Sequence, residues 1–279
     1  MSVQDAYHHA AFDHLPGSPH IKHERLRSAI VGSLVTAVRA IRDLSGRCHA
    51  LELGAGHGTF TDTLVDAGAS VVVTEMSSAR ERLLRSRFRD RSDVRVEYDD
   101  DGDWIFRTEE RFDLVVCISV LHHIPDYVRA VRRLAELTRS GGAFVCWQDP
   151  TWYPSMPTRV RAMSTGSYFA WRIGRGNLRR GVATRLRRGR GIVDETRPED
   201  SAEYHVVRQG VDQHALVRLL AARYGSVDLQ TYWSTHWGPL HRLGQRMGLE
   251  NTFAIVATGR IENDGGPRRA GTIGWGQAE

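Results

Sequence analysis

Short apolar runs, each followed by a polar or glycine-rich turn, divide the middle of this chain into predicted strands. The predicted strands lie within residues 50–53, 71–73, 94–98, 114–118 and 141–149. Between the first two runs, a helical stretch begins at Thr59 and stops at Gly68. The hydrophobic pattern therefore predicts a core of buried strands with a helix directly after the first of them.

Helical periodicity precedes this core, and more strand pattern follows it. Ser18 and Pro19 form a good cap and first-turn pair, and apolar residues then recur at helical spacing, which predicts a helix that packs on the sheet. These apolar residues are Leu26, Ile30, Leu34, Val38 and Ile41. A further helix is predicted over 211–225, and two closing strands over 226–234 and 251–259.

The turn after the first strand reads Gly54-Ala-Gly56-His-Gly58. Glycines in such a turn permit positive φ and let a ligand lie directly on the backbone, close to the positive end of the next helix. The spacing is GxGxG rather than the dinucleotide fingerprint GxGxxG, because Thr59 stands where that fingerprint needs a glycine. An ordinary tight turn would also account for this glycine spacing. Glu75 ends the second strand, about twenty residues past the first glycine, where a carboxylate can accept both hydroxyls of a ribose.

Together with the fourth strand, which ends in Leu121-His122-His123, these residues resemble the class I S-adenosylmethionine-dependent methyltransferases, in particular the small-molecule branch. The resemblance covers roughly residues 45–150. It implies an α/β fold with a Rossmann-like, mostly parallel sheet, an antiparallel last strand and helices on both faces. It also implies an N-terminal helical arm and a lid insertion after the fifth strand.

The resemblance assigns S-adenosylmethionine to the carboxyl edge of this sheet, with S-adenosylhomocysteine as product. The implied cofactor-binding residues are Glu52, Gly54, Ala55, Gly56, Glu75, Met76, Asp100, Asp101 and Ser119. Asp100 is expected to meet the adenine amino group, with Asp99 as the alternative, and Ser119 is expected to border the sulfonium. His57 departs from the small residue that is often found between the last two glycines.

Methyl transfer by in-line attack depends mostly on positioning, and a base helps only where the acceptor must lose a proton. His123 is the first candidate for that base, because it leaves the fourth strand where the methyl is expected. His122 is the second, since successive residues at a strand end point in different directions. Either could instead be a structural histidine. Tyr7, in the N-terminal arm, is a third candidate.

The acceptor is expected among residues outside the core. The predicted acceptor-binding residues are Trp147, Trp152, Tyr168, His205 and His236. Their aromatic content favours an aromatic or indole-like secondary metabolite. The pattern leaves open whether carbon, nitrogen or oxygen is methylated.

Ten arginines lie between Arg159 and Arg190 with no acid among them, and such a run could follow a phosphate backbone. An RNA-modifying methyltransferase is therefore an alternative, although a solvated basic face explains the run as well. The net charge is only +5, and Ser-Val-Leu-His-His replaces the Asn/Asp-Pro-Pro-aromatic motif of base-amino methyltransferases. We therefore do not expect a nucleic-acid partner. A cofactor-binding scaffold without catalysis is the other alternative.

Length and composition predict one domain with additions. The expected segments are an arm (1–44), the cofactor-binding core (45–150), a lid (151–210), closing elements (211–262) and a disordered tail (263–279). Three cysteines without a CxxC spacing predict reduced core thiols and no metal site. The sequence has no apolar run that could cross a bilayer and no signal-peptide pattern, which predicts a cytoplasmic enzyme, either a monomer or a homodimer.

Overall fold

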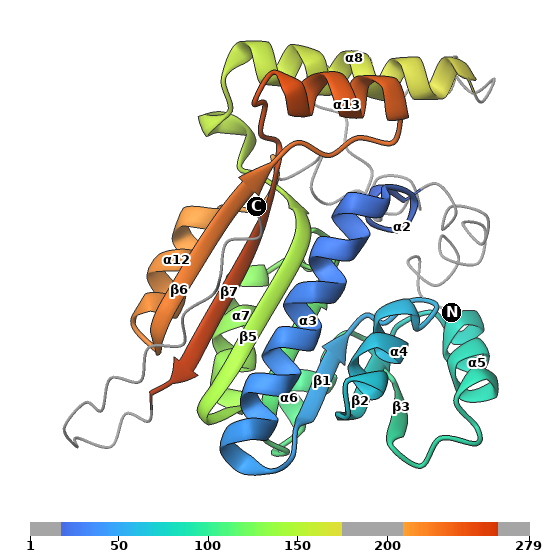
Figure 1. The fold of residues 1–279 in the computed structure, drawn as a ribbon, viewed down its shortest axis with the longest axis vertical. Helices are drawn as coiled ribbons and strands as arrows, with labels where there is room; N and C mark the ends of the chain where they lie inside the picture. The colour runs from blue at the N-terminus through green and yellow to red at the C-terminus, as the bar shows by residue number, and fades with distance from the viewer. Residues whose placement is uncertain (1–17, 175–208, 262–279) are drawn as a thin grey trace.

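The computed structural model describes residues 18–174 and 209–261 (Figure 1). These residues form a seven-stranded sheet in the order β3-β2-β1-β4-β5-β7-β6. The strands are β1 (His49–Leu53), β2 (Ser70–Glu75), β3 (Val94–Tyr98), β4 (Phe112–Ile118), β5 (Thr138–Pro150), β6 (Tyr224–Tyr232) and β7 (Thr252–Arg260). Strands β1 to β5 pair in parallel, whereas β7 is antiparallel to both β5 and β6. The predicted Rossmann-like α/β sheet with an antiparallel last strand is confirmed.

Strand order reverses beside β1, which has β2 on one side and β4 on the other. Leu51 pairs with Val72 on β2 and with Val115 on β4. In open α/β sheets, ligands bind outside the carboxyl ends of the strands at such a switch point. The glycine turn that follows β1 lies at this point.

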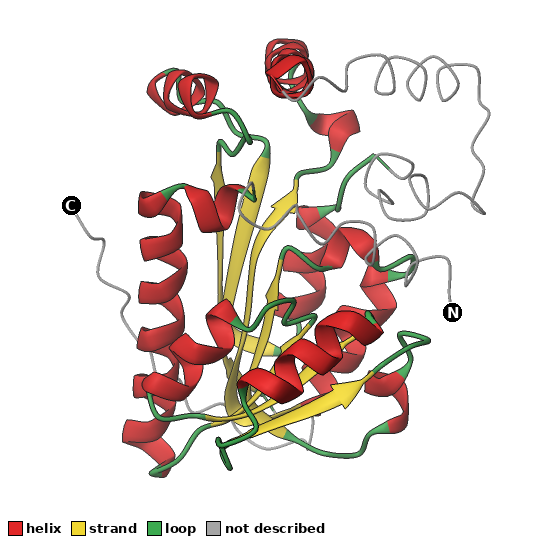
Figure 2. Ribbon diagram, turned by 90° about the vertical axis from the view of Figure 1, so that its right-hand side faces the viewer, coloured by secondary structure: helices red, strands yellow, loops and turns green. Residues whose placement is uncertain are grey.

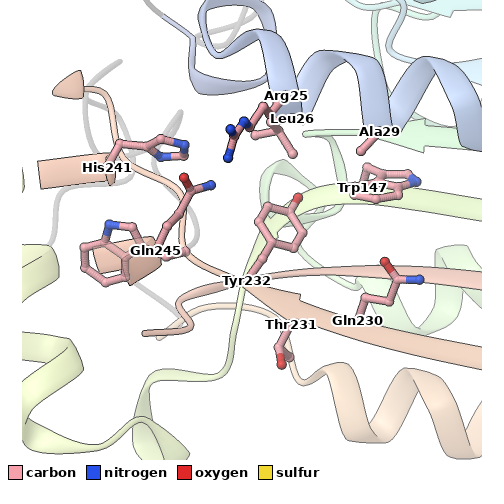
Figure 3. Close-up of a pocket in the computed structure, with 10 residues that line it drawn as sticks. Arg25, Leu26, Ala29, Trp147, Gln230, Thr231, Tyr232, His241 and Gln245 are labelled. Atoms are coloured by element: carbon pink, nitrogen blue, oxygen red, sulfur yellow. The ribbon is translucent and has the colours of Figure 1, made fainter. Parts of the chain in front are cut away.

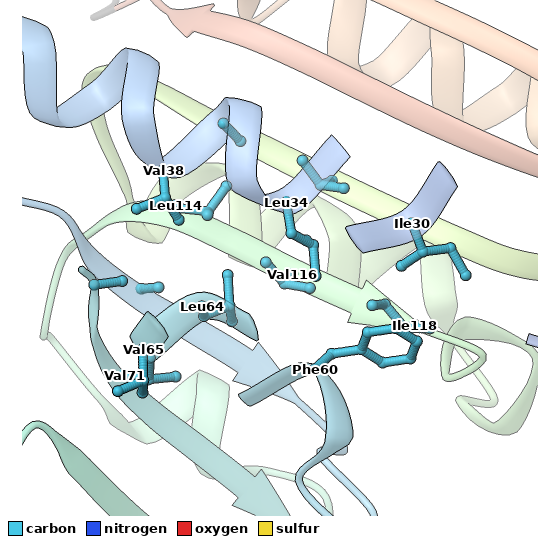
Figure 4. Close-up of a cluster of buried hydrophobic side chains, with 14 of the residues drawn as sticks. Ile30, Leu34, Val38, Phe60, Leu64, Val65, Val71, Leu114, Val116 and Ile118 are labelled. Carbon is cyan, nitrogen blue, oxygen red and sulfur yellow. The ribbon is translucent and has the colours of Figure 1, made fainter. Parts of the chain in front are cut away.

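Helices cover both faces of the sheet (Figure 2). One face carries α3 (Glu24–Ser45), α4 (Thr59–Asp66) and α5 (Ser78–Arg87), and the other carries α6 (Trp104–Arg107), α7 (Tyr127–Leu137) and α12 (Gln213–Ala221). Figure 4 shows how side chains of α3 and α4 interlock with those of β4, with Leu34 and Leu64 on either side of Val116. The five apolar positions predicted for α3 are all buried.

The helix predicted to begin at Ser18 is interrupted. A short α2 (Pro19–Lys22) precedes α3, and His23 between them has an extended backbone with φ −89° and ψ 107°. Two contacts with distant residues account for this interruption at His23. Its Nε2 is hydrogen-bonded to the carbonyl of Thr235 at 2.8 Å, and its ring stacks on that of His241 with centroids 3.7 Å apart.

A small upper layer lies beyond the carboxyl ends of β5 and β6 (Figures 1 and 2). It contains η3 (Tyr153–Ser155), α8 (Thr158–Gly174) and α13 (Gly238–Arg246). Trp233 is its centre: the side chain is 1% exposed and Nε1 donates to the carbonyl of Leu240 at 3.0 Å. The strand predicted over 226–234 therefore ends at Tyr232, because the Trp233 side chain packs against α13.

The three cysteines Cys48, Cys117 and Cys146 are buried free thiols, as predicted. No helix within the described parts of the chain has both the length and the apolar character needed to cross a membrane.

Candidate active site

The glycine turn lies between β1 and α4, and each of its glycines has positive φ: Gly54 at 68°, Gly56 at 60° and Gly58 at 78°. A Cβ on Gly54 would lie 2.8 Å from Val120, and one on Gly58 would lie 2.6 Å from Phe88. A Cβ on Gly56 would meet nothing within 4 Å. Packing therefore requires two of the glycines, while the backbone at Gly56 stays open to a ligand.

Glu75 ties this open backbone to the end of β2. The side chain is 5% exposed, its Oε2 accepts from the Gly56 N–H at 3.0 Å, and its Oε1 accepts from the Ser77 N–H at 2.9 Å. Burial raises the pKa of this carboxyl. A third backbone N–H, that of Met76, also donates to this carboxyl. A carboxylate offers about four acceptor directions, so capacity remains for a further donor such as a ribose hydroxyl.

Glu52 lies behind the turn. Its side chain is 2% exposed and accepts from the Thr61 hydroxyl of α4 at 2.6 Å, and burial raises its pKa to about 8. The contact joins the end of β1 to the first turn of α4. Glu52 therefore supports the helix that follows the glycine turn.

The acids after β3 have different surroundings. Asp99 is buried and accepts from the Trp104 N–H at 2.9 Å, and burial raises its pKa to about 6. Asp101 is paired with Arg107 at 2.6 Å. Asp100 is exposed, so its carboxylate is free of these structural contacts. Met76 packs toward this loop, where a Cβ on Gly102 would lie 3.6 Å from its Cε.

Ser119 follows β4 with φ 59°, an unusual conformation for a side chain other than glycine, and its N–H donates to the carbonyl of Trp147 at 2.8 Å. Such left-handed residues cost roughly 1–3 kcal/mol and cluster at functional sites. The turn leads directly into η2 (Leu121–His123), which carries the two histidines.

His122 is hydrogen-bonded to a residue that sequence reasoning missed. Its Nδ1 lies 2.7 Å from Oδ1 of Asp149, and the same oxygen accepts from the His122 N–H at 3.1 Å. Asp149 is 0% exposed, and its Oδ2 has no hydrogen-bond partner. The His123 ring lies beside that of His122, with centroids 4.0 Å apart. The signal for Asp149 was its place at the end of β5, since the carboxyl ends of parallel strands share one edge.

Helix α2 adds a third imidazole to this region. Burial, followed by the charges of His122 and His236, lowers the pKa of His20 to about 4. The backbone carbonyl of His236 accepts from Lys22 Nζ at 3.4 Å, which places the loop before α13 beside α2. Described His, Cys, Asp and Glu side chains form no group of three that could hold a metal ion.

The predicted acceptor residues divide into two sets. Trp147 lies near the end of β5, where its Nε1 donates to the Ser33 hydroxyl of α3 at 3.3 Å. Trp152 lies at the start of the upper layer, and its backbone N–H donates to the side-chain oxygen of Gln213 at 3.0 Å. Tyr168 belongs to α8, but its side chain lies outside the described set. Tyr7, His205 and the arginines from 175 to 190 also lie outside the described residues.

Comparison with known proteins agrees with this geometry. Residues 51–144 match a family model described as a methyltransferase domain. Ubiquinone biosynthesis O-methyltransferase from Coxiella burnetii is 27% identical over 95 residues, or 34% of this chain and 40% of that protein. The same enzyme from Bordetella avium is 32% identical over 101 residues, covering 36% of this chain and 41% of that protein. The chain thus matches about two fifths of the length of these curated relatives.

Among solved structures, the N-methyltransferase NodS from Bradyrhizobium japonicum, in complex with S-adenosyl-L-homocysteine, aligns with a TM-score of 0.52. The alignment covers 92% of this chain and 99% of NodS at 14% identity, so it bears on the fold. Sheet order, the glycine turn and the methyltransferase-domain match over residues 51–144 together support a class I S-adenosylmethionine-dependent methyltransferase. The matched methyltransferase domain extends from β1 to the middle of β5.

Proposed function

We propose that this protein transfers a methyl group from S-adenosylmethionine to a small-molecule acceptor and releases S-adenosylhomocysteine. The observation that carries the proposal is the buried Glu75 carboxylate held against the open backbone of Gly56, at the switch point of a methyltransferase sheet. Both features are what a ribose and an amino-acid tail require, and the packing of the protein itself requires neither. When bound, S-adenosylmethionine supplies an electrophilic methyl group on sulfur.

The roles of the other residues follow from their positions. Glu75 would accept from the ribose, and the backbone of Gly54, Ala55 and Gly56 would support the methionine part. Asp100 would meet the adenine amino group, with Met76 against the ring. Ser119 would border the sulfur, since β4 ends there.

For an acceptor that must lose a proton, we propose His122 as the base and Asp149 as its positioning residue. The carboxylate accepts from Nδ1–H, which fixes the ring orientation and the tautomer, so Nε2 is the basic nitrogen of the ring. His123 shares the turn and is the competing candidate. Asp149 favours His122, because a buried carboxylate stabilises the imidazolium that forms when Nε2 is protonated.

The acceptor class is proposed from the aromatic residues at the end of β5 and the start of the upper layer. This chain is similar in sequence to ubiquinone biosynthesis O-methyltransferase and in fold to the N-methyltransferase NodS. The names of these two proteins denote different methylated atoms. Trp147 and Trp152 at the end of β5 and the start of the upper layer support a planar, aromatic acceptor such as an indole-like secondary metabolite. We propose that class without assigning carbon, nitrogen or oxygen.

Calorimetric titration with S-adenosylmethionine and S-adenosylhomocysteine tests the donor directly. A donor-consumption screen over indoles, phenols, amines and short RNAs then tests the acceptor. Micromolar binding with turnover on a small aromatic compound is the expected result. Turnover on RNA alone would support the alternative acceptor, and absence of binding by either donor compound would refute the proposal.

A further inference from the structure

A cavity of about 240 Å³ lies beneath the upper layer, and none of its lining residues belongs to the glycine turn. It is bounded by the start of α3, the ends of β5 and β6, and α13 (Figure 3). Leu26, Trp147 and Tyr232 supply much of its apolar surface, and Arg25, His241 and Gln245 contribute polar groups. Four elements from distant parts of the sequence therefore build one small chamber.

The aromatic part of this chamber is held in place. The rings of Trp147 and Tyr232 are 5.7 Å apart at 44°. Trp147 is anchored by its bond to Ser33 of α3, and the Tyr232 hydroxyl accepts from the N–H of Gln148 at 3.0 Å. Rings fixed in this way give a planar ligand a surface to pack on with little loss of side-chain entropy.

Positive charge lies at the edge of the chamber. Among the residues that the structure describes, no carboxylate lines it, and Arg25 is exposed at its edge. Burial lowers the pKa of both stacked imidazoles, His23 and His241. The charge of Arg242 lowers both further, and that of Lys22 lowers the pKa of His23. Within the described ranges, none of these three cations forms an ion pair with an acid. A cationic edge without acids favours an anionic ligand. The chamber thus combines a fixed aromatic surface with positive charge at its edge.

We propose that this cavity binds an aromatic carboxylate, which is the acid-bearing part of the methyl acceptor, with Arg25 as the residue that recognises the carboxylate. The inference rests on the proposed function. The chamber is connected to the reacting centre through one strand end: the carbonyl of Trp147 accepts from Ser119, and two residues later Asp149 holds His122. The backbone of Trp147 is therefore joined to the turn that leads to His122.

Matched acid and amide probes test the charge requirement. We would titrate the full-length protein calorimetrically with indole-3-carboxylate and indole-3-carboxamide, and with benzoate and benzamide, each with S-adenosylhomocysteine present. The acids are expected to bind about tenfold more tightly or better, as a charge-assisted hydrogen bond to Arg25 predicts. Arg25→Gln should remove this preference. Arg27→Gln is the control, because Arg27 is an exposed arginine of the same helix that does not line the cavity.

Three results would overturn the proposal: equal binding of acid and amide, a preference that survives in Arg25→Gln, or no binding of any probe. A separate titration with S-adenosylhomocysteine distinguishes the two proposals. If the cofactor product binds but the acids show no preference, the cavity assignment alone is wrong. If the acids are preferred but neither donor compound binds, the proposed function fails, and with it the assignment of the cavity to a methyl acceptor.

Discussion

The imidazole of His122 is held by the carboxylate of Asp149, with 2.7 Å between Nδ1 and Oδ1. The two residues come from neighbouring parallel strand ends, after β4 and near the end of β5. Asp149 is fully buried, whereas the His122 side chain keeps 11% of its exposure. The pair has the arrangement of an oriented base: a buried acid behind the ring, and the ring at the carboxyl edge of the sheet.

Asp149→Asn should lower kcat on the order of a hundredfold, because an amide keeps the shape but no longer stabilises the imidazolium. Affinity for S-adenosylhomocysteine should stay the same, and the acid limb of the kcat pH profile should move, which a structural role alone would not cause. Asp126→Asn is the control, since Asp126 caps α7 through the Arg129 N–H and asparagine caps equally well. An unchanged pH profile would contradict the positioning role.

His122→Gln and His123→Gln separate the two candidate bases. Turnover should fall on the order of a hundredfold in His122→Gln and less than about tenfold in His123→Gln, because only His122 has the Asp149 partner. Single-turnover rates with saturating donor are the measurement. The reverse order of effects would assign the base to His123, and equal loss of donor affinity in both variants would point to a structural role for the turn.

Glu75→Gln should weaken binding of S-adenosylhomocysteine about tenfold or more. The two carboxylate oxygens accept separately, Oε2 from Gly56 and Oε1 from Ser77, and glutamine keeps only one of these oxygens, so one backbone N–H loses its acceptor and the ribose loses a charged one. Calorimetric titration gives the affinity. Glu109→Gln serves as the control because its side chain is 90% exposed. Equal affinity in Glu75→Gln and the control would show that the cofactor lies elsewhere.

Glu52 should make stability fall as pH rises through neutrality. Its pKa is about 8 in the folded protein against an ordinary value of 4.5, so the native state keeps a proton that the unfolded chain releases between these values. Glu52→Gln removes this titration. Relative to the parent, the variant should therefore gain up to about 1.4 kcal/mol in unfolding free energy per pH unit within that window.

Urea unfolding at pH 5, 6.5 and 8 measures the effect of Glu52→Gln. Glu109→Gln provides the comparison, because the Glu109 side chain is 90% exposed. A constant difference between Glu52→Gln and the parent at all three pH values would show that Glu52 is ionised in the folded protein.

Local chemistry determined much of the fold. Apolar runs bounded by turns predicted β1, β2, β4 and β5, because burial on both faces of a parallel sheet leaves a continuous hydrophobic signal. The edge strand β3 has a mixed sequence instead. The glycine turn was also predictable, since the positive φ of Gly54, Gly56 and Gly58 excludes most other residues. The apolar face of α3 followed from helical spacing alone. The family resemblance drawn from these motifs was confirmed by the matched methyltransferase domain.

Tertiary structure decided what depends on residues far apart in the chain. The partner of His122 is Asp149, 27 residues later, and no local pattern marks that contact. The break at His23 is set by Thr235 and His241, more than two hundred residues away. Likewise, Trp233 lies outside β6, although the sequence pattern predicted it as part of that strand, because its side chain packs against α13. Sequence periodicity reports which side chains must be buried, whereas only the packed chain shows which polar groups meet at the edge of the sheet.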